Sequence, residues 1–324
     1  MATPLIVADE ELESLRGLHV LVTGADGMLG RAFREALSPM ASAVTVHARA
    51  HAELDVTDER AVMECARLDP GLIVHCGGMA LADECERDPE RARAVHVDGT
   101  RNVGRLAIEC GARVVYPQSV FIFDGRELPV TETTQPNPPM VYGRMKLEAE
   151  RYLLAEVPDS LVVRMAGFFG GDDRDKNFVG KFVRELDAAM RSGASRVEVG
   201  DRVWQPTYTL DLARNTLLLV AQARSGVYNM GALGEATFFD VARVCVDELG
   251  LDEHLALDPS RAEVFSGAEP ARRPHRMVTA NLRLEREGLL RQRRWDDALR
   301  EYLARPWFDQ FRRAPSADRE LGVR

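Results

Sequence analysis

Three glycines spaced three residues apart place the strongest constraint on the fold of this chain. Gly24, Gly27 and Gly30 follow a short apolar run at 18–22 and precede a helical pattern over 31–37. A strand, a glycine turn and a helix in this order let backbone N–H groups approach a diphosphate at the helix N-terminus. The spacing is G-x-x-G-x-x-G rather than the more common G-x-G-x-x-G. The motif therefore predicts a phosphate-binding turn that opens a strand–helix unit.

Apolar strand-like runs and helical patterns alternate along the first half of the chain. The strand-like runs are rich in β-branched residues, and the helical ones repeat apolar residues every three to four positions. The predicted strands lie at 43–47, 72–75, 113–116 and 161–164, and the predicted helices at 58–68, 100–110 and 142–155. This alternation predicts an α/β fold, a Rossmann-type doubly wound parallel sheet with helices on both faces.

The rhythm changes after residue 168. Segments there become irregular, and two further helices are predicted, at 237–249 and 295–304. We expect a cofactor-binding Rossmann domain and a smaller C-terminal substrate-binding lobe that is interleaved with it. The expected division assigns 1–167 to the Rossmann domain, with its last sheet elements from about 204–230, and 168–324 mainly to the lobe.

Composition and charge argue against several classes of protein. The net charge of −9 comes from interspersed acids and bases, so a nucleic-acid groove is not expected. No apolar run approaches the roughly 18 residues of a membrane span. The acidic N-terminus is unlike a signal peptide, and five cysteines without a C-x-x-C pair predict a reduced, cytoplasmic protein without structural zinc. The histidines show no metal-ligand spacing, and no stripe marks an interface, so a homodimer stays open.

A tyrosine and a lysine four residues apart carry the most specific chemistry. Tyr142 and Lys146 lie on one face of the predicted helix at 142–155. An ammonium near a phenol lowers its pKa, which would suit Tyr142 as proton donor to a carbonyl that receives hydride. Ser119 follows the strand at 113–116, at the carboxyl edge of the sheet, where its hydroxyl could orient that carbonyl. These three side chains are the predicted catalytic residues.

The end of the second predicted strand bears on the choice of cofactor. An acid at this place would hydrogen-bond the adenosine ribose and favour NAD, but residues 47–51 contain none. Arg49 stands there instead, and a guanidinium can pair with a 2′-phosphate. We therefore predict NADP(H), with NAD(H) as the less favoured cofactor.

Seven segments together resemble an extended short-chain dehydrogenase/reductase. Within that group, they are most similar to the dTDP-4-dehydrorhamnose reductases and related nucleotide-sugar 4-ketoreductases. The segments are TGADGMLG at 23–30, ELDVTD at 53–58, VHCGGMALADECERDPERARAVHVDGT at 74–100, SVFIFDG at 119–125, VYGRMKLEAE at 141–150, KNFVGKFV at 176–183 and WQPTYTLDLA at 204–213. The similarity runs from about residue 18 to about residue 283.

The resemblance implies roles for residues that no pattern assigns by itself. Asp55 and Val56 would contact the adenine, and the segment from Gly77 to Met79 would pass close to the ribose and phosphate of the cofactor. With Tyr142 and Lys146, the expected cofactor-binding residues are Gly24, Asp26, Gly27, Met28, Leu29, Gly30, Arg49, Asp55, Val56, Cys76, Gly77 and Gly78. The expected substrate-binding residues are Met79, Val120, Phe121, Asn177, Gln205 and Arg273. No metal site is expected.

The function implied by the resemblance is reduction of the C4 keto group of a nucleotide-linked 4-keto-6-deoxy sugar with NADPH, in deoxysugar biosynthesis. The expected substrate is dTDP-linked. Three positions depart from the family pattern: Val120 and Phe121 replace an aspartate and a tyrosine, and His96 stands where an asparagine is usual.

Two other functions stay open at this point. Nucleotide-sugar 4-epimerases use the same serine, tyrosine and lysine with tightly held NAD⁺, although the missing acid after the second strand argues mildly against them. The regulatory subunit of methionine adenosyltransferase resembles the same family and acts as a binding partner rather than as an enzyme. Because the residues at 120 and 121 depart from the family pattern, that alternative stays open.

Overall fold

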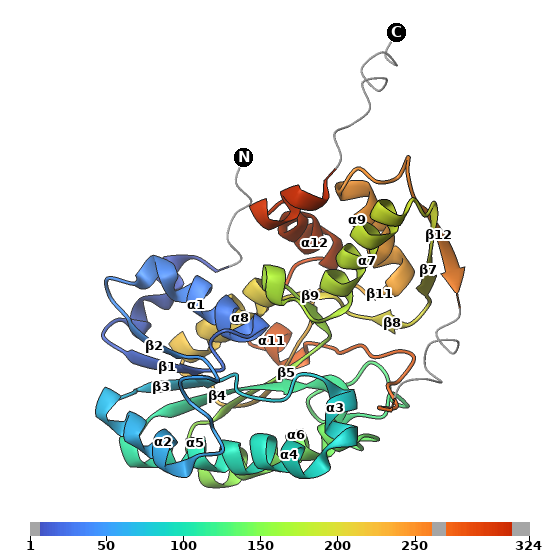
Figure 1. The fold of residues 1–324 in the computed structure, drawn as a ribbon. Coiled ribbons are helices and arrows are strands. Elements are labelled where there is room, and N and C mark those ends of the chain that lie inside the picture. Colours follow the sequence, from blue (N-terminus) through green and yellow to red (C-terminus); the bar gives the residue numbers. More distant parts are fainter. Residues whose placement is uncertain (1–6, 261–269, 313–324) are drawn as a thin grey trace.

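A six-stranded parallel sheet forms the centre of the computed structural model, which describes residues 7–260 and 270–312. The strand order is β10-β5-β4-β3-β1-β2, so the chain starts near one edge and crosses the sheet to the other. The strands are β1 (His19–Thr23), β2 (Thr45–Arg49), β3 (Leu72–His75), β4 (Arg113–Ser119), β5 (Leu161–Met165) and β10 (Gly226–Met230). The predicted doubly wound α/β fold is confirmed (Figure 1).

Alternate residues of each strand face opposite layers of helices. Val20 and Val22 of β1 pack in the core that contains α1 (Met28–Leu37) and α8 (Thr209–Ala221). Leu21, between them, packs in the opposite core, against α5 (Gly99–Cys110) and α6 (Val141–Glu156). Because side chains alternate across a strand, this arrangement buries both faces of the sheet.

Shorter helices complete the layer around α5 and α6. They are α2 (Glu59–Met63), α3 (Ala82–Arg87) and α4 (Pro89–Arg93), with the 3₁₀ segments η3 (Glu64–Leu68) and η5 (Val120–Ile122) and the π-helical turn η4 (Ala94–Asp98). Elsewhere lie the 3₁₀ segments η1 (Asp9–Leu15), η2 (Ser38–Met40), η6 (Asp172–Arg174) and η7 (Pro306–Phe311), and the helix α11 (Leu282–Arg286). Among the described residues, no helix is long and apolar enough to cross a bilayer.

A second body, with its own aromatic core, stands above the carboxyl side of the sheet in Figure 1. Trp204, Tyr208, Tyr302 and Phe308 are among the side chains that fill it. Its helices are α7 (Phe178–Ser192), α9 (Phe238–Glu248) and α12 (Trp295–Leu303). Its strands pair as β7 (Arg196–Gly200) with β12 (Ala256–Ser260), β8 (Val203–Trp204) with β11 (Ala236–Thr237), and β6 (Phe168–Phe169) with β9 (Thr207–Tyr208).

The bounds of the second strand and the pairing of the strands in segment 204–230 refine the sequence predictions. The second strand was expected at 43–47 but runs from Thr45 to Arg49, because a turn in which Ala43 N–H donates to Met40 O delays its start. Of the segment 204–230, only β10 joins the main sheet, since β8 and β9 pair in small separate sheets. The first shift places Arg49 inside β2, opposite Thr23 of β1.

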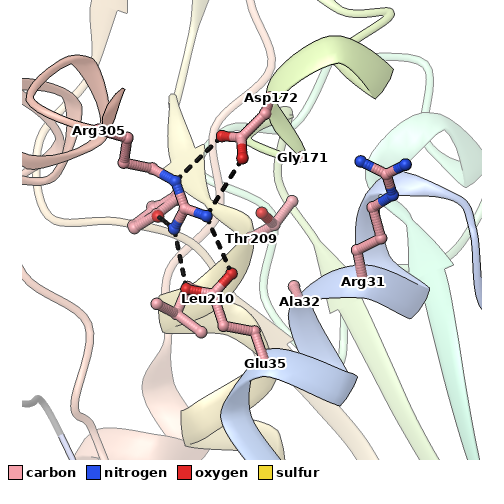
Figure 2. Close-up of a pocket in the computed structure, with 9 residues that line it drawn as sticks. Arg31, Ala32, Glu35, Gly171, Asp172, Thr209, Leu210 and Arg305 are labelled. Atoms are coloured by element: carbon pink, nitrogen blue, oxygen red, sulfur yellow. Dashed lines mark hydrogen bonds and ion pairs between the residues drawn. The ribbon is translucent and has the colours of Figure 1, made fainter. Parts of the chain in front are cut away.

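Arg305 joins the two bodies through a cluster of ion pairs around a small cavity of about 40 Å³ (Figure 2). One guanidinium nitrogen donates to Glu35 of α1 at 2.8 Å and to the Tyr208 hydroxyl at 3.1 Å. The Nε atom lies 3.0 Å from Asp172 Oδ1. The Arg305 side chain is 29% exposed, so this cluster is shielded from solvent more than an ordinary surface pair. It ties the aromatic core of the second body to the helix that follows the glycine turn.

We expect Arg305→Ala to lower the free energy of unfolding by about 1–3 kcal/mol, because two carboxylates lose a charge-assisted partner. Arg305→Lys should recover only part of this, since an ammonium cannot reproduce the forked contact. Urea denaturation checks both values. Arg60→Ala is the matched control. It also removes an ion pair, the one with Glu64, but the Arg60 side chain is 90% exposed, so the free energy of unfolding should hardly change. Equal losses for Arg305 and Arg60 would contradict the prediction.

Candidate active site

The three predicted catalytic side chains meet at the carboxyl end of β4. Ser119 is the last residue of β4, and η5 follows it directly. Tyr142 lies in the first turn of α6, and Lys146 lies one turn later. The Ser119 hydroxyl accepts a bond of 3.1 Å from the Phe121 N–H, and its interaction with the Tyr142 phenol acts to lower the pKa of that phenol. The sequence prediction that these residues share one edge of the sheet is therefore matched by their positions.

Gly143 allows this close approach between α6 and the turn after Ser119. A Cβ atom at position 143 would lie 2.8 Å from Pro138 Cβ and would also collide with the Phe121 carbonyl oxygen. Backbone atoms cannot move aside at such a contact, so only glycine fits between Tyr142 and the rest of α6. The glycine in Tyr-Gly-Arg-Met-Lys thus has a packing reason.

The electrostatic expectation for Tyr142 is wrong in this arrangement. Burial raises the pKa of Tyr142 to about 12, while the interaction with Ser119 acts in the opposite direction. The Lys146 amine donates instead to Pro117 O at 2.6 Å and lies 3.8 Å from the centroid of the Tyr116 ring. Burial also lowers the pKa of Lys146, to about 7. Desolvation outweighs the expected effect of the ammonium on the phenol, so Tyr142 is a protonated phenol at neutral pH.

Buried polar groups that the sequence analysis missed connect β4 and α6 beside this site. The Gln118 amide nitrogen donates to Lys146 O at 2.9 Å and to Glu150 at 2.8 Å, and its oxygen accepts from the Ser119 N–H at 2.8 Å. Glu150 in turn forms an ion pair with Arg164 of β5, and both side chains are almost fully buried. Glu150 lies four residues after Lys146, a spacing that could have suggested it; Gln118 and Arg164 become neighbours only through the β4–β5 register.

The glycine turn has the shape that a cofactor diphosphate needs. Gly24 has φ +60°, and a Cβ there would lie 2.7 Å from Cys76 O. A Cβ on Gly30 would lie 2.7 Å from Ala25 Cα. Gly27 is the N-cap of α1, where no described side chain caps the helix and the first turn carries no acid. The N–H groups that begin α1 and the positive end of the helix dipole therefore suit an anionic group.

Arg49 stands beside this turn. Its backbone oxygen accepts a bond of 3.0 Å from the Ala25 N–H, which joins the end of β2 to the glycine turn. The guanidinium donates to the neighbouring Ala48 O at 3.0 Å and forms no ion pair within residues 7–260 and 270–312. Asp55, by contrast, accepts two bonds of 2.9 Å from Thr57, which lower the pKa of its carboxyl. Val56 is buried, and a Cβ on Gly77 would lie 3.1 Å from its side chain.

Two of the six expected substrate residues lie close to Tyr142. Met79 belongs to an apolar cluster that contains Tyr142, and Phe121 belongs to a neighbouring cluster that contains it too. Val120, however, is 3% exposed and packs in a separate core with Ile122. The turn η5 directs this side chain inward, and a substrate contact of Val120 stays a prediction.

The other three expected substrate residues have partners within the protein. Gln205 is buried: its nitrogen donates to Ala232 O at 2.7 Å, and its oxygen accepts from the Thr279 N–H at 3.0 Å. Both ends of its amide thus have partners within the protein. Arg273 pairs with Asp83 at 2.9 Å, and Asn177 is the N-cap of α7, its amide donating to Phe168 O at 2.8 Å. Their predicted roles remain predictions.

Comparisons with known proteins identify the family. The family model described as the RmlD substrate binding domain matches residues 18–307. A dTDP-4-dehydrorhamnose reductase from Mycolicibacterium smegmatis is 32% identical over 293 residues, which cover 88% of this chain and 85% of that protein. The crystal structure of a dTDP-4-dehydrorhamnose reductase from Clostridium acetobutylicum is 29% identical and superposes with a TM-score of 0.81, covering 88% of this chain and 98% of that one.

One similar protein is named as a subunit of another enzyme and not as a reductase. The methionine adenosyltransferase 2 subunit beta of Danio rerio is 30% identical over 284 residues, covering 84% of this chain and 85% of that protein. Similarity of this extent thus does not separate the reductases from this subunit. The family model, however, spans most of the chain, including the glycine turn and the Ser119, Tyr142 and Lys146 site. This chain belongs to the RmlD substrate binding domain family.

Proposed function

We propose that this protein is an NADPH-dependent ketoreductase that acts on the C4 keto group of a nucleotide-linked 4-keto-6-deoxy sugar. The observation that carries the proposal is the placement of Ser119, at the end of β4, beside Tyr142 in the first turn of α6, one helical turn from Lys146. The reductase names of the Mycolicibacterium and Clostridium relatives support the substrate class. By the same similarity, we propose dTDP as the nucleotide and a cytoplasmic location.

Each catalytic side chain has one task in the proposed reaction. Tyr142, with a pKa of about 12, carries its proton at neutral pH and would donate it to the oxygen of the carbonyl. Ser119 would hydrogen-bond that same oxygen and orient it toward the phenol. Lys146 would hold ribose hydroxyls of the cofactor with its amine. NADPH, when bound, supplies the hydride.

Turnover is the direct test of the proposed function. Purified protein should oxidise NADPH when a dTDP-4-keto-6-deoxyhexose is added, and the product should be a dTDP-6-deoxyhexose with a new hydroxyl at C4. The subunit beta of Danio rerio favours a second candidate, a cofactor-binding regulatory subunit without turnover. That candidate predicts NADPH binding without oxidation, together with co-purification with a methionine adenosyltransferase. Tightly retained NAD⁺ with C4 inversion would indicate an epimerase instead.

The predicted preference for NADPH over NADH depends on one residue, Arg49. We expect Arg49→Ala to weaken NADPH binding about 10- to 100-fold and to leave NADH binding nearly unchanged, because only NADPH carries the 2′-phosphate. Fluorescence titration of both cofactors measures the two affinities. Arg67→Ala, which removes an arginine that is 74% exposed on η3, serves as the charge-matched control. A preference for NADPH that survives in Arg49→Ala would remove Arg49 from the argument.

A further inference from the structure

Two buried histidines lie between the glycine turn and Tyr142. His75 ends β3 and is 2% exposed, and His96 sits in the π-helical turn η4 and is 3% exposed. His75 Nδ1 lies 2.8 Å from the Thr23 hydroxyl, and His75 Nε2 lies 3.2 Å from the Thr100 hydroxyl. The Thr100 hydroxyl donates to His96 O at 2.6 Å. One continuous chain of hydrogen bonds therefore runs from β1 to η4.

The chemistry of the partners fixes the direction of this chain. The Thr100 hydroxyl has one proton and gives it to a carbonyl, so it accepts from His75, and His75 Nε2 carries a proton. In a neutral ring, Nδ1 is then an acceptor, and the Thr23 hydroxyl donates to it. The Thr23 oxygen remains free to accept the bond of 3.1 Å that comes from the Gly77 N–H. His96 Nε2 lies 3.2 Å from Met79 O, which can only accept, so this nitrogen also carries a proton.

Two side chains of this group, the Thr23 hydroxyl and the His96 ring, hold the two ends of one short segment. Gly77 is bound at its N–H through Thr23, and Met79 is bound at its carbonyl by His96. The glycines between them lie against the two rings: a Cβ on Gly77 would be 3.4 Å from His75 Cε1, and one on Gly78 would be 3.1 Å from His96 Cε1. Segment 77–79 is thus held between the histidines, at the place where the cofactor is expected.

His96 also contacts Tyr142, the proposed general acid. The rings of His96 and Tyr142 lie edge to face, with centroids 5.3 Å apart and planes at 85°. Such a contact fixes the orientation of a ring, since aromatic pairs prefer this geometry. His75 lies farther away, stacked on Tyr116, whose ring is in contact with the Lys146 amine. The same chain therefore extends to the surroundings of both Tyr142 and Lys146.

We infer that His75 and His96, linked through Thr100 and both neutral with the proton on Nε2, position segment 77–79 for the cofactor and hold the Tyr142 ring for proton donation. The part of this inference that concerns Tyr142 rests on the proposed function; the part that concerns segment 77–79 requires only cofactor binding. Burial lowers the pKa of each histidine to about 3, with Lys146 acting in the same direction, which agrees with neutral rings.

Replacing Thr100 tests the link between the histidines. Thr100→Val keeps the shape but removes both hydrogen bonds, and we expect the dissociation constant for NADPH to rise about 5- to 30-fold. Thr100→Ser keeps the hydroxyl and should restore wild-type affinity. Thr45→Val, at an exposed position of β2, is the matched control and should change nothing. An affinity for Thr100→Val equal to that of Thr45→Val, in folded protein, would overturn the link.

Replacing His96 separates its two contacts. His96→Phe keeps an aromatic edge against Tyr142 but loses the bond to Met79, so KM for NADPH should rise while kcat stays near that of the wild type. His96→Ala loses both contacts, and kcat should fall as well. A merely structural role would lower the stability of both variants without this split between KM and kcat. Equal kcat in both variants would remove Tyr142 from the inference.

Ring-nitrogen NMR at pH 7 reads the protonation states directly, without turnover. With ¹⁵N-labelled histidine, His75 and His96 should each show a protonated Nε2 and a bare Nδ1, and His96→Phe assigns its own signals by their loss. An imidazolium or a protonated Nδ1 at either position would overturn the directed chain. If wild-type protein binds NADPH but oxidises none with a 4-keto sugar nucleotide, the proposed function fails. The NMR and affinity experiments still decide the positioning of segment 77–79.

Discussion

Tyr142→Phe is expected to lower kcat for the NADPH-dependent reduction by about 10²–10⁴-fold, the usual contribution of a general acid. The phenol is the group that carries a proton at neutral pH, since burial raises its pKa to about 12, and phenylalanine has none to give. Affinity for NADPH should stay nearly constant, because the ring and its contact with His96 remain. Initial rates and fluorescence titration measure the two quantities.

Tyr152→Phe is the matched control for this experiment. Tyr152 lies on the same helix, and among the described residues its hydroxyl makes a single long bond, of 3.4 Å to Arg101 O, so its loss should leave kcat unchanged. Lys146→Ala should differ from both, reducing the rate and the cofactor affinity together. Lys146→Arg should not rescue it fully, because Lys146 is buried and a planar guanidinium is larger than an ammonium. A near wild-type kcat in Tyr142→Phe would contradict the assignment of the acid.

The local parts of this site could be predicted from the sequence because each depends on neighbouring residues. The glycine turn needs only the spacing of Gly24, Gly27 and Gly30, and the shared face of Tyr142 and Lys146 needs only helical periodicity. Ser119 was placed correctly because parallel strands end at a common edge. These are the interactions for which sequence distance and spatial distance agree.

The features that the sequence did not predict depend on long-range contacts. Val120 and Gln205 carry no local sign that they are buried: η5 turns the first into a core, and Thr279, far along the chain, binds the second. The pKa of Tyr142 could not be predicted from Lys146 alone, because the balance between burial and charge depends on what surrounds the phenol. The histidine chain, too, needs Thr23 and Thr100 on separate elements.

Glu150→Ala is expected to lower the free energy of unfolding by about 3–5 kcal/mol, because it leaves the Arg164 guanidinium buried without a counter-charge. Glu150 is 2% exposed and Arg164 5%, so water cannot replace the lost carboxylate. The double variant Glu150→Leu/Arg164→Met should regain much of this loss, since it removes the unpaired charge and fills the space with apolar groups. Chemical denaturation measures the free energy of unfolding of each variant. If the loss in the double variant equalled the sum of the losses in Glu150→Leu and Arg164→Met alone, the argument would be contradicted.

The same double variant shows what the ion pair contributes beyond stability. Glu150 accepts the Gln118 amide, which also binds Lys146 O and receives the Ser119 N–H, so one buried side chain spans the two catalytic elements. Without Glu150, Gln118 loses the partner that orients its amide, and Ser119 can shift relative to Tyr142. We therefore expect the double variant to fold well and still to have a lower kcat than wild-type protein. A variant that regains stability and keeps full kcat would show that the pair serves the fold alone.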